Sequence, residues 1–234
     1  MKETSDREKI IRLFEPFDNK IFSVKNRFVR AATWLGACED ATGRATPAAI
    51  SRQAETASGG AGTVISEFSY ISPEGKAVPR QWGLDRGEAV DDVRRLAGVI
   101  HGSGSKLVVQ ICHAGGARRA DFSNGMPAYS PSGGEYPGSD MRSIMMTEED
   151  IQKVRRDFAA AALRAREGGA DGVEIHGAHG YLLTQFLSPL INRRSDRYGG
   201  CFENRLRLTR EVYASVREAV GRDRKSTRLN SSHL

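Results

Sequence analysis

Residues 171–204, DGVEIHGAHGYLLTQFLSPLINRRSDRYGGCFEN, decide the fold. The stretch begins with a short apolar run at 173–175, shortly after Gly168-Gly169, a pair typical of a helix C-terminus. We interpret this run as a buried strand entered from a helix. Two histidines and a tyrosine, His176, His179 and Tyr181, follow directly. Parallel β/α folds bind ligands in the loops at this end of their strands, so these side chains are candidates for chemistry.

The same strand-and-helix pattern precedes this stretch. Strands are predicted over residues 28–33, 62–68 and 107–111, and a β-hairpin over residues 14–29. Helices are predicted to begin at Thr46-Pro47 and at the capping-box-like Thr147, and another contains residues 93–100. A helix after residue 201 has a predicted apolar stripe of Phe202, Leu206, Thr209, Tyr213, Val216 and Val220. The long segment 112–146, rich in Gly, Pro and Ser, is predicted to be a functional loop.

This alternation predicts a parallel sheet with helices on its outer face. Four βα units without a glycine-rich dinucleotide fingerprint favour a TIM (β/α)8 barrel over a doubly wound sheet. We expect residues 1–221 to form the N-terminal part of such a barrel, whose usual length is about 250 residues. Residues 222–234, RDRKSTRLNSSHL, are polar and lack periodicity, so we predict a tail that does not look native and no fifth strand.

Composition sets further bounds. The chain has 234 residues, 39% of them hydrophobic, and a net charge of +6 that is dispersed rather than gathered with aromatic residues into a patch. Nucleic acid is therefore not an expected partner. No apolar run is long enough to span a membrane and no secretory signal is visible, so we expect a cytoplasmic protein. The three cysteines are far apart in sequence and are interpreted as reduced thiols.

Several short signatures resemble the Old Yellow Enzyme family of FMN-dependent NAD(P)H:flavin oxidoreductases. The most specific are VEIHGAHGYLL at 173–183 and NRRSDRYGG at 192–200, within a resemblance that covers about residues 13–221. Supporting matches are KNRFV at 25–29, VQ at 109–110, HAG at 113–115 and YPG at 136–138. The resemblance implies an ene-reductase that takes hydride from NAD(P)H through FMN and reduces small alkenes conjugated to a carbonyl, of enone or enoyl type.

The resemblance also implies roles for particular residues. His176 and His179 would hold the substrate carbonyl oxygen, with His176 also near FMN, and Tyr181 would donate the proton. Gln110 would bind the flavin through its amide. Trp34 occupies the position at which many relatives tune the flavin potential. Small residues suited to close approach to the flat ring are Ala31, Ala32, Thr33 and Ala61, although for Ala61 simple packing is an equal alternative.

Two alternatives remain open at the level of sequence. The spacing of His176 and His179 could belong to a metal-dependent hydrolase, although no third ligand stands at metal-like spacing, so no metal is expected. The chain could also be an incomplete, non-catalytic half barrel with unpaired strand edges. The phosphate of FMN is bound near strands seven and eight in barrels of this kind. We therefore expect the 234-residue chain alone to be inactive and not to hold FMN.

Overall fold

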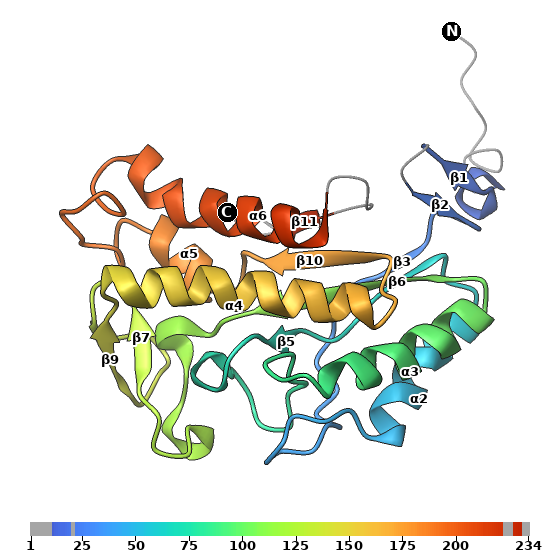
Figure 1. The fold of residues 1–234 in the computed structure, drawn as a ribbon, viewed down its shortest axis with the longest axis horizontal. Helices are drawn as coiled ribbons and strands as arrows, with labels where there is room; N and C mark the ends of the chain where they lie inside the picture. Colours follow the sequence, from blue (N-terminus) through green and yellow to red (C-terminus); the bar gives the residue numbers. More distant parts are fainter. Residues whose placement is uncertain (1–10, 20–21, 222–226, 231–234) are drawn as a thin grey trace, which may run out of the picture.

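The computed structural model describes residues 11–19, 22–221 and 227–230. Its main sheet is parallel, and its strands lie in chain order, which is the arrangement of a barrel wall (Figure 1). These strands are β3 (Val29–Arg30), β4 (Thr63–Ile65), β6 (Lys106–Cys112), β10 (Gly172–His176) and β11 (Thr227–Asn230). Strands were predicted at four of these five positions, and the prediction of a partial TIM barrel is confirmed.

Four long helices cover the sheet in the same order as the strands (Figure 1). They are α2 (Pro47–Ser58), α3 (Ala89–Gly102), α4 (Glu148–Glu167) and α6 (Phe202–Val220). Thr46 caps α2 by accepting a hydrogen bond from the Ala49 amide, and Pro47 takes the first helical position. Thr147 and Asp150 form a reciprocal capping box at the start of α4. The helix starts predicted from capping residues are therefore confirmed.

The core lies between this helix layer and the sheet. The apolar faces of α3 and α4 are buried and pack against the strands of the sheet. The stripe predicted for α6 is partly wrong, because Phe202 is 57% and Tyr213 is 43% exposed. The residues that α6 buries step by four from its second turn: Leu208, Val212, Val216 and Val220, together with Thr209. This row faces α4, so helix packing rather than the first apolar residue sets the buried face.

Other segments refine the predictions. The expected N-terminal hairpin is present as β1 (Phe17–Asp18) and β2 (Ser23–Val24). The strand predicted over 62–68 ends at Ile65 and pairing resumes in β5 (Ser69–Tyr70), because the Glu67 amide leaves the ladder to donate to Gln53 Oε1. Elements not predicted are β7 (Ala128–Ser130), β8 (Gly134–Glu135), β9 (Arg142–Met145), α5 (Leu182–Leu187) and the short 3-10 turns Pro73–Gly75, Gly115–Ala117 and Ala120–Phe122.

Strand β11 differs from the prediction that no strand follows residue 221. It pairs in parallel with β10, from Val173 opposite Thr227 to His176 opposite Asn230. Such pairing uses main-chain N–H and C=O groups, which an open edge of β10 offers to any extended segment. A polar sequence without periodicity can therefore occupy the position of a fifth strand. Among the described residues, no helix is long and apolar enough to cross a membrane.

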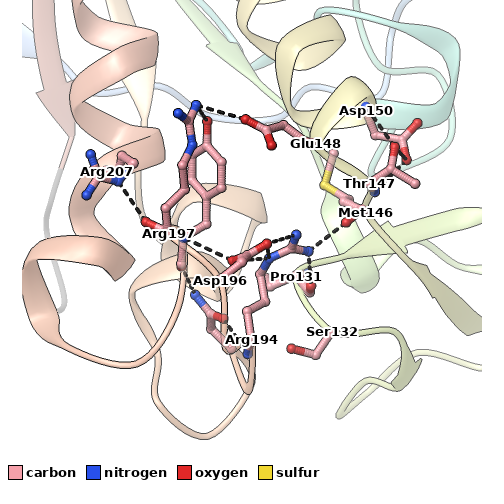
Figure 2. A network of polar contacts seen from close by, with 12 residues as sticks. Pro131, Ser132, Met146, Thr147, Glu148, Asp150, Arg194, Asp196, Arg197 and Arg207 are labelled. Atoms are coloured by element: carbon pink, nitrogen blue, oxygen red, sulfur yellow. Dashed lines mark hydrogen bonds and ion pairs between the residues drawn. The ribbon is translucent and has the colours of Figure 1, made fainter.

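A buried arginine joins the segment after α5 to the segment before α4 (Figure 2). The Arg194 side chain is only 3% exposed, and its Nη1 donates to the carbonyls of Pro131 (2.7 Å) and Met146 (2.6 Å). Its Nε donates to Asp196 at 3.0 Å. Arg197, which is half exposed, forms an ion pair with Glu148 at 3.0 Å. The RSDRYGG motif is therefore a structural tie that fixes the start of α6 against α4.

We predict that Arg194→Met lowers the free energy of unfolding by about 3 kcal/mol, because it leaves two buried carbonyls without a donor. Arg197→Met is the matched control and should cost less than about 1 kcal/mol, since its ion pair is exposed to solvent. Urea unfolding monitored by circular dichroism measures both. Hydrogen bonding from Arg194 holds the Asp196 pKa below its usual value. The stability contributed by this ion pair is therefore present at neutral pH and is lost as pH falls through the Asp196 pKa of the folded state. Equal losses in the two variants would contradict the assignment.

Candidate active site

A pocket of about 610 Å³ opens where the strands of the main sheet end. The pocket is lined by small residues after β3, an aromatic residue after β4, an amide on β6 and the last residue of β10. Its lining is Val29, Ala31, Ala32, Trp34, Ile65, Phe68, Gln110, Glu174, His176, His179 and Tyr181. Seven of the nine residues that the sequence analysis singled out, Trp34 among them, are therefore brought together around one cavity, although they lie on or after three separate strands.

The two histidines meet inside this pocket. His176 is the last residue of β10 and only 3% exposed, and its Nε2 lies 3.2 Å from Nδ1 of His179. The rings are close to perpendicular, at 75°, with centroids 5.0 Å apart. Burial, helped by the charge of His179, lowers the pKa of His176 to about 4. His176 is therefore neutral at pH 7, and its Nδ1 is buried without a hydrogen-bond partner among the described residues.

Tyr181 stands beside this pair. Its ring stacks on Phe68 at 5.8 Å and meets the edge of His176 at 5.1 Å and 88°. Burial raises the Tyr181 pKa well above its usual value, and the neighbouring Cys112 and Tyr136 add to the shift. The hydroxyl consequently keeps its proton at neutral pH. It is an acid that gives up its proton only to a strong base, such as a developing carbanion.

Gln110 and Glu174 lie side by side on paired strands. The β6–β10 register sets the two residues opposite one another, and Gln110 Nε2 donates to Glu174 Oε1 at 2.6 Å. A carboxylate only accepts hydrogen bonds, so it selects the amide nitrogen and turns Oε1 of Gln110 away from itself. That oxygen accepts no hydrogen bond from the described residues. The pocket wall therefore offers an acceptor with a fixed orientation to a ligand N–H group.

Two predicted residues are not part of the pocket. Thr33 is exposed outside it, and its hydroxyl accepts a hydrogen bond from Arg30 Nη1 at 2.6 Å. Ala61 lies before the first residue of β4, at the opposite end of the strand from the pocket, where its carbonyl accepts from Ser105. The prediction of Ala61 as a flavin contact is therefore corrected: its small size serves packing at the far end of the sheet.

The sequence analysis gave no role to four residues of the pocket lining, Val29, Ile65, Phe68 and Glu174, of which the last two contact other site residues. Phe68 follows the end of β4 and packs against both Tyr181 and His176. The rule that ligands bind after the C-terminal ends of parallel strands could have found it, because it ends the predicted strand over 62–68. Glu174 could have been found as the one carboxylate inside the apolar run of β10, a residue type that is rarely buried without a partner.

The arrangement suits a flat, partly polar ligand and an oxygen that gains negative charge. Small alanines and aromatic rings form the walls, and the two imidazoles converge on one point. No group of three or more potential metal ligands occurs in the part of the chain that the structure describes. The buried Nδ1 of His176 has no partner among the described residues, and Gln110 Oε1 accepts no hydrogen bond from them, so a polar ring system could satisfy both groups. Fold and pocket together define a β/α-barrel protein with a polar pocket at the C-terminal ends of its strands.

Comparison with known proteins identifies the family. The chain belongs to the NADH:flavin oxidoreductase / NADH oxidase family, whose model matches residues 12–234. It is 36% identical over 205 residues to a Halalkalibacterium halodurans NADPH dehydrogenase, covering 88% of this chain and 59% of the relative. The NADPH dehydrogenase of Bacillus subtilis is 33% identical over 207 residues, covering 88% of this chain and 60% of the relative. The predicted family resemblance is confirmed, and FMN with NAD(P)H agrees with it.

Solved structures agree. The old yellow enzyme homologue from Zymomonas mobilis superposes with a TM-score of 0.82 and 30% identity, covering 93% of this chain and 62% of that chain. A 2-naphthoyl-CoA reductase in complex with 2-naphthoyl-CoA gives a TM-score of 0.87 and 29% identity, covering 93% of this chain and 34% of that chain. The chain therefore spans about three fifths of the length of the curated relatives it matches.

The low pKa of His176 predicts an acid-sensitive fold. The unfolded chain takes up a proton on this residue near pH 6.5 and the folded chain only near pH 4, so stability is lost as pH falls between these values. The loss is on the order of 3 kcal/mol. His176→Gln should flatten this dependence in urea unfolding at pH 7 and pH 5, with a residual slope from His113, which is buried and shifted in the same direction. A His176 resonance that titrates near pH 6.5 would contradict the assignment.

Proposed function

We propose that the protein is an FMN-dependent oxidoreductase that reduces alkenes conjugated to a carbonyl, with NAD(P)H as the reductant. Membership of the flavin oxidoreductase family supports the cofactor and the redox chemistry. The observation that carries the proposal is the meeting of His176 and His179 ring nitrogens beside the buried Tyr181 hydroxyl. Two imidazole donors and a weak acid around one point match the needs of an oxygen that becomes an enolate.

The residues of the pocket fit the ring of FMN, which when bound would supply the hydride. Ala31 and Ala32 give a flat ring close access to the backbone after β3. Gln110 Oε1, oriented by Glu174, offers an acceptor to a ring N–H group. Trp34 adds an aromatic wall that is 44% exposed. His176, whose Nδ1 has no hydrogen-bond partner among the described residues, would offer a polar group to the bound ligands.

The histidines bind and polarise the substrate. Each donates one N–H bond to the carbonyl oxygen when both nitrogens that now face one another carry hydrogen. Because His176 is neutral and buried, its bond acts in a low dielectric and strengthens as charge develops on the oxygen. Tyr181 Oη then gives its proton to the α-carbon and regains one from water. Phe68, stacked on the Tyr181 ring, holds that ring in place.

The substrate class is the part of the proposal that rests most on this geometry. The aromatic lining from Phe68, Tyr181 and Trp34 favours flat conjugated molecules over branched aliphatic ones. One structural relative is described as a complex with 2-naphthoyl-CoA, a flat aromatic thioester, and another as a morphinone reductase. Both names are consistent with a small-molecule carbonyl compound as the substrate here.

Replacing the histidines should weaken binding of phenols, because a phenolate mimics the enolate oxygen. In FMN-loaded protein, with the barrel completed to the length of its relatives, we expect His176→Ala to weaken phenol binding about tenfold or more, since each donor contributes one charge-assisted hydrogen bond. The double variant with His179→Ala should abolish the long-wavelength absorption change on phenol addition. His101→Ala, an exposed histidine on α3, is the control. Unchanged phenol affinity in the double variant would exclude the oxyanion role.

Tyr181→Phe tests the proton donor in the same protein. Reoxidation of reduced flavin by an alkene should slow by about a hundredfold or more, a typical contribution of general acid catalysis. Reduction of the flavin by NAD(P)H should stay close to normal, because it does not use this proton. Tyr213→Phe, at an exposed position on α6, is the control. Rapid-mixing spectroscopy separates the two half-reactions, and equal losses in both would instead indicate damaged packing. A colourless protein with bound zinc would favour the hydrolase alternative.

A further inference from the structure

The turn between β10 and α5 has an unusual backbone. His179 and Gly180 are consecutive and both left-handed, with φ of +54° and +73°. A non-glycine residue in this region costs of order 1 kcal/mol or more unless the surroundings hold it there. His179 and Tyr181, on either side of Gly180, are both pocket residues. The conformation of this turn therefore decides where two of the three proposed catalytic side chains point.

Two side chains from elsewhere converge on the Gly180 carbonyl. The Tyr136 hydroxyl donates to it at 2.6 Å, and Gln185 Nε2 donates at 2.7 Å. Tyr136 belongs to the long segment between β6 and α4, whereas Gln185 lies on α5 and is 1% exposed. A side chain at position 180 would also collide with the Tyr136 hydroxyl, since a Cβ there would lie 2.5 Å from it. Glycine at position 180 is therefore favoured both by the close contact with the Tyr136 hydroxyl and by the positive φ.

Gln185 also ties the turn to the loop after β6. Its Oε1 accepts from the Gly116 amide at 2.9 Å, and its Nε2 donates a second bond to the Ala114 carbonyl at 3.0 Å. Both Nε2 hydrogens are used, and Oε1 has an acceptor role, so the buried amide is satisfied. Gly115 has φ of +63°, and a Cβ on it would lie 2.3 Å from Gln185 Oε1. Gly115 of the HAGG sequence at 113–116 therefore leaves room for the Gln185 amide.

We propose that Tyr136 and Gln185 are positioning residues that hold the His179–Gly180 turn and so aim His179 and Tyr181 into the pocket. Neither side chain lines the pocket, so neither contacts a ligand there. The effect of these residues on catalysis rests on the function proposed above, whereas their effect on the turn does not. The proposal also assigns a role to the long segment between β6 and α4, because this segment carries Tyr136 and places its hydroxyl on the Gly180 carbonyl.

Hydrogen exchange tests the effect on the turn without flavin. The reporters are the amides of Tyr181 and Leu182, which donate to Ala178 and His113 at 3.2 and 3.0 Å. Tyr136→Phe removes one hydroxyl, and these amides should exchange about tenfold faster while those of α6 do not change. Tyr129→Phe is the control, because the Tyr129 hydroxyl makes no hydrogen bond to the described residues. Unchanged exchange in Tyr136→Phe, or the same change in the control, would overturn the proposal.

The half-reactions test the effect on catalysis in the FMN-loaded protein. Tyr136→Phe should slow reoxidation by the alkene several-fold while reduction by NAD(P)H is affected much less, because only reoxidation uses the Tyr181 proton. Gln185→Glu, similar in shape but without the two donated hydrogen bonds, should have a larger effect of the same kind. Equal losses in both half-reactions would mean a merely structural role and contradict the proposal. If the unaltered protein reduces no alkene, the proposed function fails, and the exchange result still decides whether these residues hold the turn.

Discussion

The parallel pairing of β6 with β10 is the constraint on which the rest of the site depends. Its register sets Gln110 opposite Glu174 and leaves His176 at the strand end, where the chain turns into the pocket. A slip of β10 by one residue would move Glu174 and His176 to the helix-covered face and away from Gln110. The same pairing brings the loops after the two strands together, so that Gln185 can reach both. The β6–β10 pairing thus positions both the polar side chains of the pocket and the Gln185 contacts that hold the neighbouring loops.

Burial gives these polar groups their properties. His176 is neutral because the pocket disfavours its charged form, and the Tyr181 pKa rises for the same reason. A neutral imidazole and a protonated phenol are both hydrogen-bond donors at pH 7. An oxygen that gains negative charge beside them is therefore stabilised without any prior change in protonation. Burial thus sets the protonation states of His176 and Tyr181 before a ligand binds.

Local signals in the sequence were enough for the framework and for part of the pocket lining. Capping residues located α2 and α4, and the position past a strand end located His176, His179 and Tyr181, whereas Gln110 was found through the family resemblance. Ala61 was chosen for its size, although its place before the predicted strand over 62–68 already put it at the end of that strand away from the pocket. Other failures occurred where long-range contacts decide. The buried row of α6 depends on α4, and the tie through Gln185 depends on a contact across 69 residues of sequence, which no local pattern encodes.

A crystal structure of the FMN-loaded protein with a bound phenol tests the central claim most directly. The account predicts that the phenol oxygen lies within hydrogen-bonding distance, about 2.6–3.2 Å, of both His176 Nε2 and His179 Nδ1, with the Tyr181 hydroxyl beside the ring. It also predicts that Gln110 Oε1 contacts the flavin ring while its amide nitrogen keeps the bond to Glu174. A phenol bound elsewhere, or a metal ion between the histidines, would contradict it.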